Sequence, residues 1–168
     1  MTAFARLNWD EPDVCAIVVG RGIATVEPAF EATCEAWLSR RGYRLHVFDF
    51  ARGISGVVSQ IAQFFHWKEQ FGYELDPASR NLDALRDGFQ IEEPGLVLKL
   101  LHFDEALSAD ASWCRGFLSI ISEQSLRRLA LGERFFALLP VADSAALPGL
   151  CFERSCIPFP IRFRERAT

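Results

Sequence analysis

The fold assignment depends on one short stretch, Asn81-Leu82-Asp83-Ala84-Leu85-Arg86-Asp87. Its apolar residues recur at helical spacing, and each helical residue turns by about 100° relative to the one before it. Leu82, Leu85 and Phe89 then share one face, which can anchor a helix on a core. Asp83 and Asp87 lie one turn apart on another face. The stretch therefore predicts a short amphipathic helix with an acidic outer face.

The start of this helix has two possible caps. Asn81 is a favoured N-cap, and it would place Asp83 in the positively polarised first turn. Alternatively, Asp76 is the cap and Pro77 the first helical residue, and then neither aspartate gains from the helix dipole. Like charges one turn apart cost an isolated helix roughly 0.2–0.5 kcal/mol. Asp87 lies beyond the first turn, so a partner explains it better than helix electrostatics does.

Strand and helix patterns alternate along the rest of the chain. Apolar runs predict strands over residues 14–19, 44–50, 95–101 and 134–139. Helical spacing predicts a helix between Pro28 and Gly42, an apolar helix capped by Ser55, and a long helix that ends near Leu131. Strands separated by helices imply an α/β fold with a parallel sheet and right-handed crossovers.

The length suits a single domain over residues 1–168. Half of the residues are hydrophobic, which allows a sizeable core, and no long linker divides the chain. The tail from residue 142 is loop-like. Residues 157–163 fit at most an edge strand, because Pro158 and Pro160 cannot donate ladder hydrogen bonds.

The charge pattern excludes some partners. A formal net charge of −4 argues against non-specific binding to nucleic acid. Residues 71–110 hold nine acidic residues and three basic ones. This acidic middle can steer a cationic partner, or it can simply form a solvated face.

Cysteine usage and hydropathy predict a cytoplasmic location. Five scattered cysteines, none in a C-x-x-C pair, suit reduced thiols. The N-terminus lacks the apolar core of a signal peptide, and no apolar run approaches the ~20 residues that span a bilayer. We therefore expect no membrane contact, and the oligomeric state stays open.

No constellation of residues supplies an enzyme's chemistry. Gly20-Arg21-Gly22 lies where a phosphate loop could follow a predicted strand, but a third glycine and a Walker lysine are missing. His66 and His102 stand alone at the ends of predicted elements, without the spacing of metal ligands. We therefore expect no catalytic activity, no cofactor and no metal. A small-ligand-binding protein is the least supported alternative.

Residues 43–141 resemble the barstar family of intracellular ribonuclease inhibitors in local sequence and in the order of elements. A strand leads through Ile54-Ser55 into an apolar helix, and a loop with Phe71-Gly72 follows. Residues 81–87 match the family's short helix at all but one position, and Pro94-Gly95-Leu96-Val97-Leu98 resembles the strand after it. The resemblance implies a barstar-like core over residues 43–141 of a bacterial protein. Residues 1–42 then add a βα extension and residues 142–168 a tail.

The resemblance also implies a function, that of a protein-binding inhibitor or immunity protein. A carboxylate on a rigid helix would occupy the phosphate position in the cationic active site of a basic nuclease or toxin. No direct contact with nucleic acid is implied. The residues implied in partner binding are, in order of weight, Asp87, Asp83, Arg86, Asn81, Tyr73, Gly72 and Phe71.

Three departures from the family pattern bear on the partner. Arg86 stands where the family has an aromatic residue, and the loop over residues 73–80 is longer. Arg127 falls near the position of a family glutamate on the long helix. Arg86 can pair with Asp83 or Asp87, or contact an acidic spot on the partner. A second hypothesis is therefore a barstar-like interaction domain that inhibits no nuclease.

Overall fold

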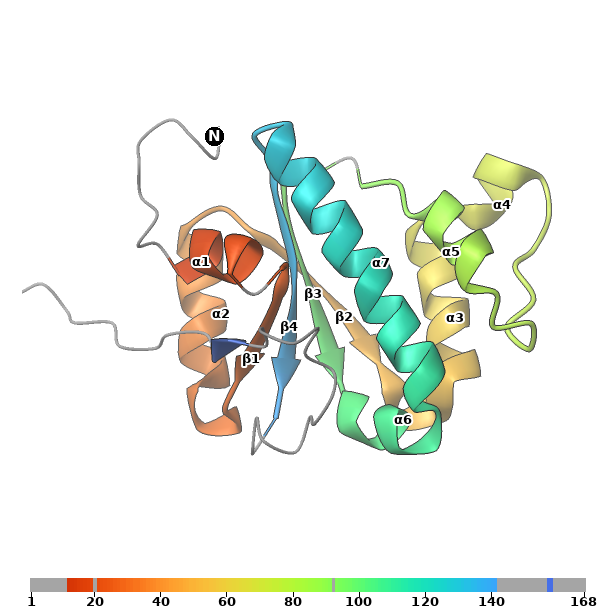
Figure 1. Cartoon of the computed structure of the whole chain (residues 1–168), viewed down its shortest axis with the longest axis horizontal. Helices are drawn as coiled ribbons and strands as arrows, with labels where there is room; N and C mark the ends of the chain where they lie inside the picture. Colours follow the sequence, from red (N-terminus) through yellow and green to blue (C-terminus); the bar gives the residue numbers. More distant parts are fainter. Residues whose placement is uncertain (1–11, 20, 92, 142–156, 159–168) are drawn as a thin grey trace, which may run out of the picture.

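A parallel five-stranded sheet forms the centre of the molecule (Figure 1). The computed structural model describes residues 12–19, 21–91, 93–141 and 157–158. The strands run across the sheet in the order β2-β3-β4-β1-β5, and every neighbouring pair is parallel. Their bounds are Ile23–Val26 (β1), Arg44–Asp49 (β2), Gly95–Leu101 (β3), Arg134–Pro140 (β4) and Ile157–Pro158 (β5). The predicted α/β fold with a parallel sheet is confirmed.

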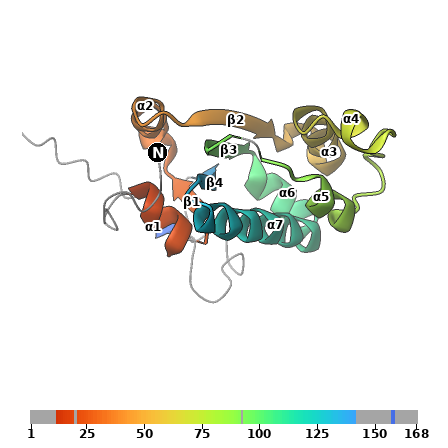
Figure 2. The same cartoon turned by 90° about the horizontal axis from the view of Figure 1, so that it is seen from above.

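Helices cover both faces of this sheet, as crossover connections in a parallel sheet require. One side carries α1 (Pro12–Val18), the 3-10 helix η1 (Pro28–Phe30) and α2 (Glu31–Arg40). Figures 1 and 2 place the remaining helices on the other side. These are η2 (Phe50–Arg52), α3 (Gly53–Phe64), α4 (Trp67–Phe71), α5 (Leu82–Gly88), α6 (Phe103–Ala109) and α7 (Ala111–Ala130).

The central strands β3 and β4 divide their side chains between two cores. Residues 96–100 and 135–139 are buried throughout. Alternate residues, such as Leu98 and Ala137, join the larger core beneath α3, α5 and α7. Their neighbours, such as Val97 and Phe136, join a smaller core beneath α1 and α2. Two-sided burial explains why these strands read as continuous apolar runs.

Residues 14–19 do not form the predicted strand, because most of them belong to α1. A short apolar run fits a buried strand or a buried helix equally well, so long-range contacts decide. Ala16 and Ile17 pack into the smaller core. The buried carboxylate of Asp13 accepts hydrogen bonds from Tyr43 Oη at 2.5 Å and from Arg134 Nη1. These contacts fix α1 to the start of β2 and β4.

The turn at residues 21–22 therefore lies between a helix and a strand, which is the reverse of the predicted order. Gly22 has φ of +78°, and a Cβ at this position would lie 2.3 Å from Ser125 Cβ in α7. Glycine is needed here for the approach of α7 to the sheet. This packing explains Gly22 without a phosphate ligand. Gly20 lies outside the described residues.

Other differences are smaller. α3 begins at Gly53, so Ser55 lies inside the helix and does not cap it. The sequence did not predict α6, whose seven residues give little periodicity. β5 confirms an edge strand at residues 157–158, next to β1, whereas residues 159–163 lie outside the described part of the chain.

The described cysteines and helices give two further observations. Cys34 and Cys114 are buried free thiols, and the side chains of the other three cysteines lie outside the described set. Among the helices that the structure describes, none combines the length and the apolar character needed to cross a bilayer.

Candidate functional site

Helix α5 begins where the Asn81 cap predicts. Asn81 Oδ1 accepts hydrogen bonds from the backbone N–H groups of Asp83 at 3.0 Å and Ala84 at 3.1 Å. The alternative cap is wrong, because the Asp76 carboxylate accepts from the Ala78 N–H at 2.9 Å, in a turn before the helix. Asn81 is thus engaged by the helix itself. Asp83 lies in the first turn, where the helix dipole favours a negative charge.

The two predicted faces of α5 are confirmed. Leu85 and Phe89 are buried in the larger core, and the partly buried Leu82 packs against it. Asp83 and Asp87 are exposed on the outer side. The helix is short, so its position depends on packing far more than on its own hydrogen bonds.

Two glycines allow α5 to lie close against both neighbouring helices. Gly88, its last residue, faces the indole of Trp67 in α4, and a Cβ there would lie 2.1 Å from Trp67 Cζ3. Gly116 in α7 faces Leu82, and a Cβ would lie 2.3 Å from Leu82 Cδ1. These two contacts, one near each end, hold α5 between α4 and α7.

Arg86 takes part in two ion pairs on the surface of α5. Its Nη1 lies 3.1 Å from Asp83 Oδ1, and its Nε lies 3.3 Å from Glu123 Oε2 in α7. All three side chains are largely exposed, so each pair contributes about 0–1 kcal/mol of stability. Of the two pairings that the sequence left open for Arg86, the structure shows the one with Asp83. The pairing with Glu123 links residues distant in sequence, and no local pattern could have shown it.

The Asp87 carboxylate differs from that of Asp83. It is exposed, and within the described part of the chain it makes no hydrogen bond and no ion pair. Arg86 compensates Asp83 and Glu123 instead. Asp87 therefore carries the uncompensated negative charge of this helix.

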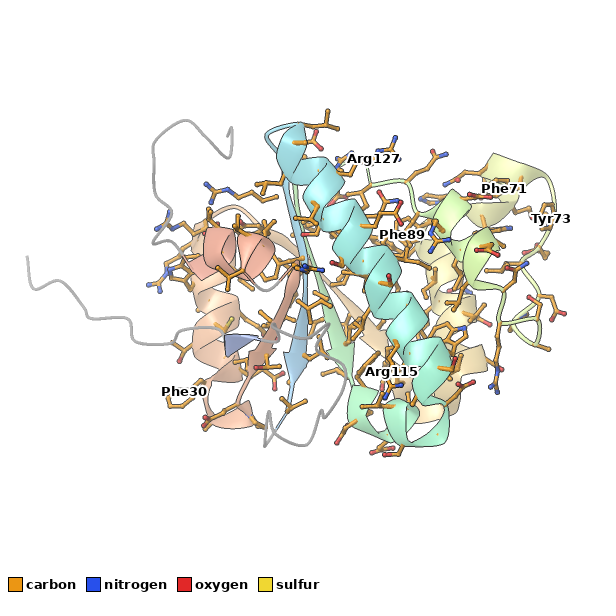
Figure 3. The ribbon with its side chains drawn as sticks, in the orientation of Figure 1. Phe30, Phe71, Tyr73, Phe89, Arg115 and Arg127 are labelled. Atoms are coloured by element: carbon orange, nitrogen blue, oxygen red, sulfur yellow. The ribbon has the colours of Figure 1, made fainter. Side chains whose placement is uncertain are left out.

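An aromatic cluster of Trp67, Phe71 and Tyr73 adjoins α5. Ring centroids are 4.6 Å apart for Trp67–Phe71, 6.3 Å for Trp67–Tyr73 and 6.1 Å for Phe71–Tyr73. Trp67 is buried, whereas 36% of Phe71 and 53% of Tyr73 is exposed (Figure 3). Gly72, with φ of +75°, ends α4 and allows the chain to turn between these two rings. Because Trp67 also packs against Gly88, a buried contact joins the aromatic cluster to α5.

The predicted loop that contains Phe71 and Gly72 starts one residue later in the structure than in the prediction. Phe71 is the last residue of α4, so the loop predicted over residues 71–80 begins at Gly72. Sequence reasoning missed Trp67, which supports both exposed rings. A helix of five residues is too short for a periodic signal, and only the contact with Gly88 shows its role.

Arg127 lies outside this network of contacts. It is exposed near the C-terminal end of α7, whereas Arg115 lies near the other end (Figure 3). The acidic residue of α7 that reaches α5 is Glu123, one helical turn earlier than Arg127. The surface beside α5 is thus mixed in charge rather than uniformly acidic.

Comparison with known proteins gives no match among protein-family models, curated proteins or solved structures. Within the described residues, no cluster of three or more histidine, cysteine or carboxylate side chains could hold a metal ion. The site is therefore interpreted from its own geometry.

Proposed function

We propose that this chain is a barstar-like inhibitor or immunity protein, which inserts α5 into the cationic active site of a ribonuclease or related toxin. The observation that carries the proposal is Asp87, an exposed carboxylate without a partner among the described residues. A cationic active site would supply the charge-assisted hydrogen bonds that Asp87 lacks. We assign Asp87 first, with Asp83, Phe71 and Tyr73 as the further candidate site residues.

The packing of α5 supports this role. Gly88 and Gly116 hold the helix against α4 and α7, so Asp87 is displayed on a rigid element. A rigid surface loses little conformational entropy on binding. Exposed aromatic rings are typical of the residues that dominate binding energy in protein interfaces. Phe71 and Tyr73 fit that pattern.

The ion pairs of Arg86 favour a second candidate, an interaction domain that inhibits no nuclease. Arg86 neutralises Asp83, so the helix presents one uncompensated carboxylate rather than two. A partner that binds this surface must tolerate a guanidinium between the two aspartates. A partner with both a cationic and an acidic spot satisfies that condition, and such a surface need not be an active site.

Direct binding and inhibition assays separate these candidates. We suggest a panel of purified basic ribonucleases and toxin domains, starting with products of genes next to this one. Each is measured for affinity to the full chain and for cleavage of a fluorogenic RNA. The first candidate expects tight binding with loss of cleavage, and the second expects binding with cleavage intact.

The site is tested by Asp87→Ala, with Asp104→Ala as the matched control. Asp104 is an exposed aspartate of α6, outside the proposed surface. Asp87→Ala should weaken binding at least tenfold, which is about 1.4 kcal/mol. Asp104→Ala should leave binding unchanged. Unchanged affinity for Asp87→Ala would show that the partner binds elsewhere.

A further inference from the structure

A cavity of about 410 Å³ lies between the end of α3, α4 and the start of β3. Its walls include Phe64 and Phe65 of the α3 end, Gln70 of α4, and Leu96 of β3. A cavity of this size can enclose a small organic molecule. None of its lining residues belongs to α5, so the proposed docking helix does not form this cavity.

Two of the residues that line the cavity, Gln70 and Glu93, each carry a buried side-chain oxygen without a hydrogen-bond donor among the described residues. Gln70 Nε2 donates to the Phe65 carbonyl oxygen at 2.5 Å, which fixes the amide and leaves Oε1 as the unpaired atom. Glu93 Oε1 accepts from Arg44 Nη1, whereas Glu93 Oε2 is buried and unpaired. Within the described chain, no residue donates to either oxygen. Buried acceptors without donors destabilise a protein, so a bound water or ligand that donates to these oxygens would be stabilising.

The walls also restrict the charge and shape of that molecule. Arg44 neutralises Glu93, and the other polar walls include the uncharged amides of Gln63, Gln70 and Gln90. With Arg44 and Glu93 paired, His66 is the remaining titratable side chain of the walls, and this lining favours an uncharged ligand over a charged one. The phenyl rings and Leu96 provide apolar surface for a flat ligand.

We infer that this cavity binds a small, uncharged, planar molecule with N–H donors, such as an amino-substituted heterocycle or a carboxamide. Its N–H groups donate to Gln70 Oε1 and Glu93 Oε2, after small side-chain movements that open these atoms to the ligand. The amide groups of Gln63 and Gln90 are available to the ligand's own acceptors.

Matched pairs of probes test this assignment on the full chain. Nicotinamide and adenine carry amino donors, whereas nicotinate and purine keep similar rings without those amino groups. Titration calorimetry should give nicotinamide or adenine a dissociation constant near or below about 1 mM. The matched probe should bind at least tenfold more weakly. Absence of binding by both donor probes, or equal binding within both pairs, would overturn the inference.

Three variants locate the site. Gln70→Leu removes one acceptor, and Glu93→Gln keeps the side-chain size while placing an amide N–H₂ where Oε2 stood. Each should weaken the donor probe at least tenfold. Glu69→Gln changes the preceding residue of α4, which does not line this cavity, and should bind as the wild type does. Because Gln70→Leu also loses the bond to Phe65, circular dichroism checks its fold. Unchanged binding by folded Glu93→Gln contradicts the inference whatever Gln70→Leu does.

Discussion

The contact between Gly88 and Trp67 gives the sharpest test of how α5 is held. In Gly88→Ala the new Cβ would lie 2.1, 2.7 and 2.9 Å from three atoms of the indole ring, against the 3.5–4.0 Å of ordinary carbon contacts. Trp67 is buried at 2% exposure and lies 4.6 Å from Phe71 between ring centroids, so the ring has little room to move away. Overpacking of this kind costs about 1–3 kcal/mol. Alanine regains up to about 1 kcal/mol of helix propensity, less at a helix end, so the expected net loss is about 1–2 kcal/mol.

Gly116→Ala is the matched comparison for this loss. Its Cβ would lie 2.3 Å from Leu82 Cδ1, a terminal methyl that can rotate away, and Gly116 lies inside a helix where alanine is favoured. We expect its stability to stay within about 1 kcal/mol of the wild type. Urea denaturation followed by circular dichroism measures both variants. If Gly88→Ala unfolds at the same or a higher urea concentration than the wild type, the close packing of α5 on α4 is refuted.

Three further predictions concern the titratable groups Asp13, His46 and Cys34. Asp13→Ala leaves Arg134 without its buried carboxylate and should lower the free energy of unfolding by about 3–5 kcal/mol, whereas Asp104→Ala on the surface should change it little in the same denaturation assay. Burial lowers the pKa of His46 below 6.5, so the unfolded chain protonates first and stability falls as pH drops through and below 6.5. His46→Gln should reduce that acid-side loss, and an equal loss in both proteins would contradict it. Burial raises the pKa of Cys34 to about 12, so site-resolved mass spectrometry should detect alkylation of Cys34 only after unfolding, and rapid native labelling would disprove this.

Sequence reasoning succeeded where the determining contacts are local. The Asn81 cap and the apolar face of α5 follow from residues within two helical turns, and both are confirmed. β3 and β4 were predicted because continuous apolar runs suit strands buried on both faces. Residues 14–19 are also a continuous apolar run, yet most of them belong to a helix that Asp13 anchors to Arg134. No pattern within that segment distinguishes the two outcomes.

In the candidate site, too, the features set by local sequence were predicted and those set by tertiary packing were missed. The sequence placed Asp83 and Asp87 on one exposed face, and the structure agrees. Glu123 and Trp67 were missed because their roles arise only when α7 and α4 pack against α5. The unpaired oxygens of Gln70 and Glu93 could not be predicted either. The sequence gives the side chain but does not show whether its oxygen has a hydrogen-bond donor in the fold. Pairing across the fold is a tertiary property.

The position of β1 in the sheet has a consequence for synthesis on the ribosome. β2, β3 and β4 pair in chain order, but β1 pairs with β4. Ile23 therefore cannot form its parallel pair until Ala137 has been synthesised. Contacts between residues so far apart form late, because closing a long loop costs entropy before any pairing compensates it. The apolar strand β1 is synthesised before β2, β3 and β4, yet it can pair only after β4 has been made. We expect the nascent chain to carry β1 unpaired until β4 has emerged, which makes that interval an aggregation-prone stage.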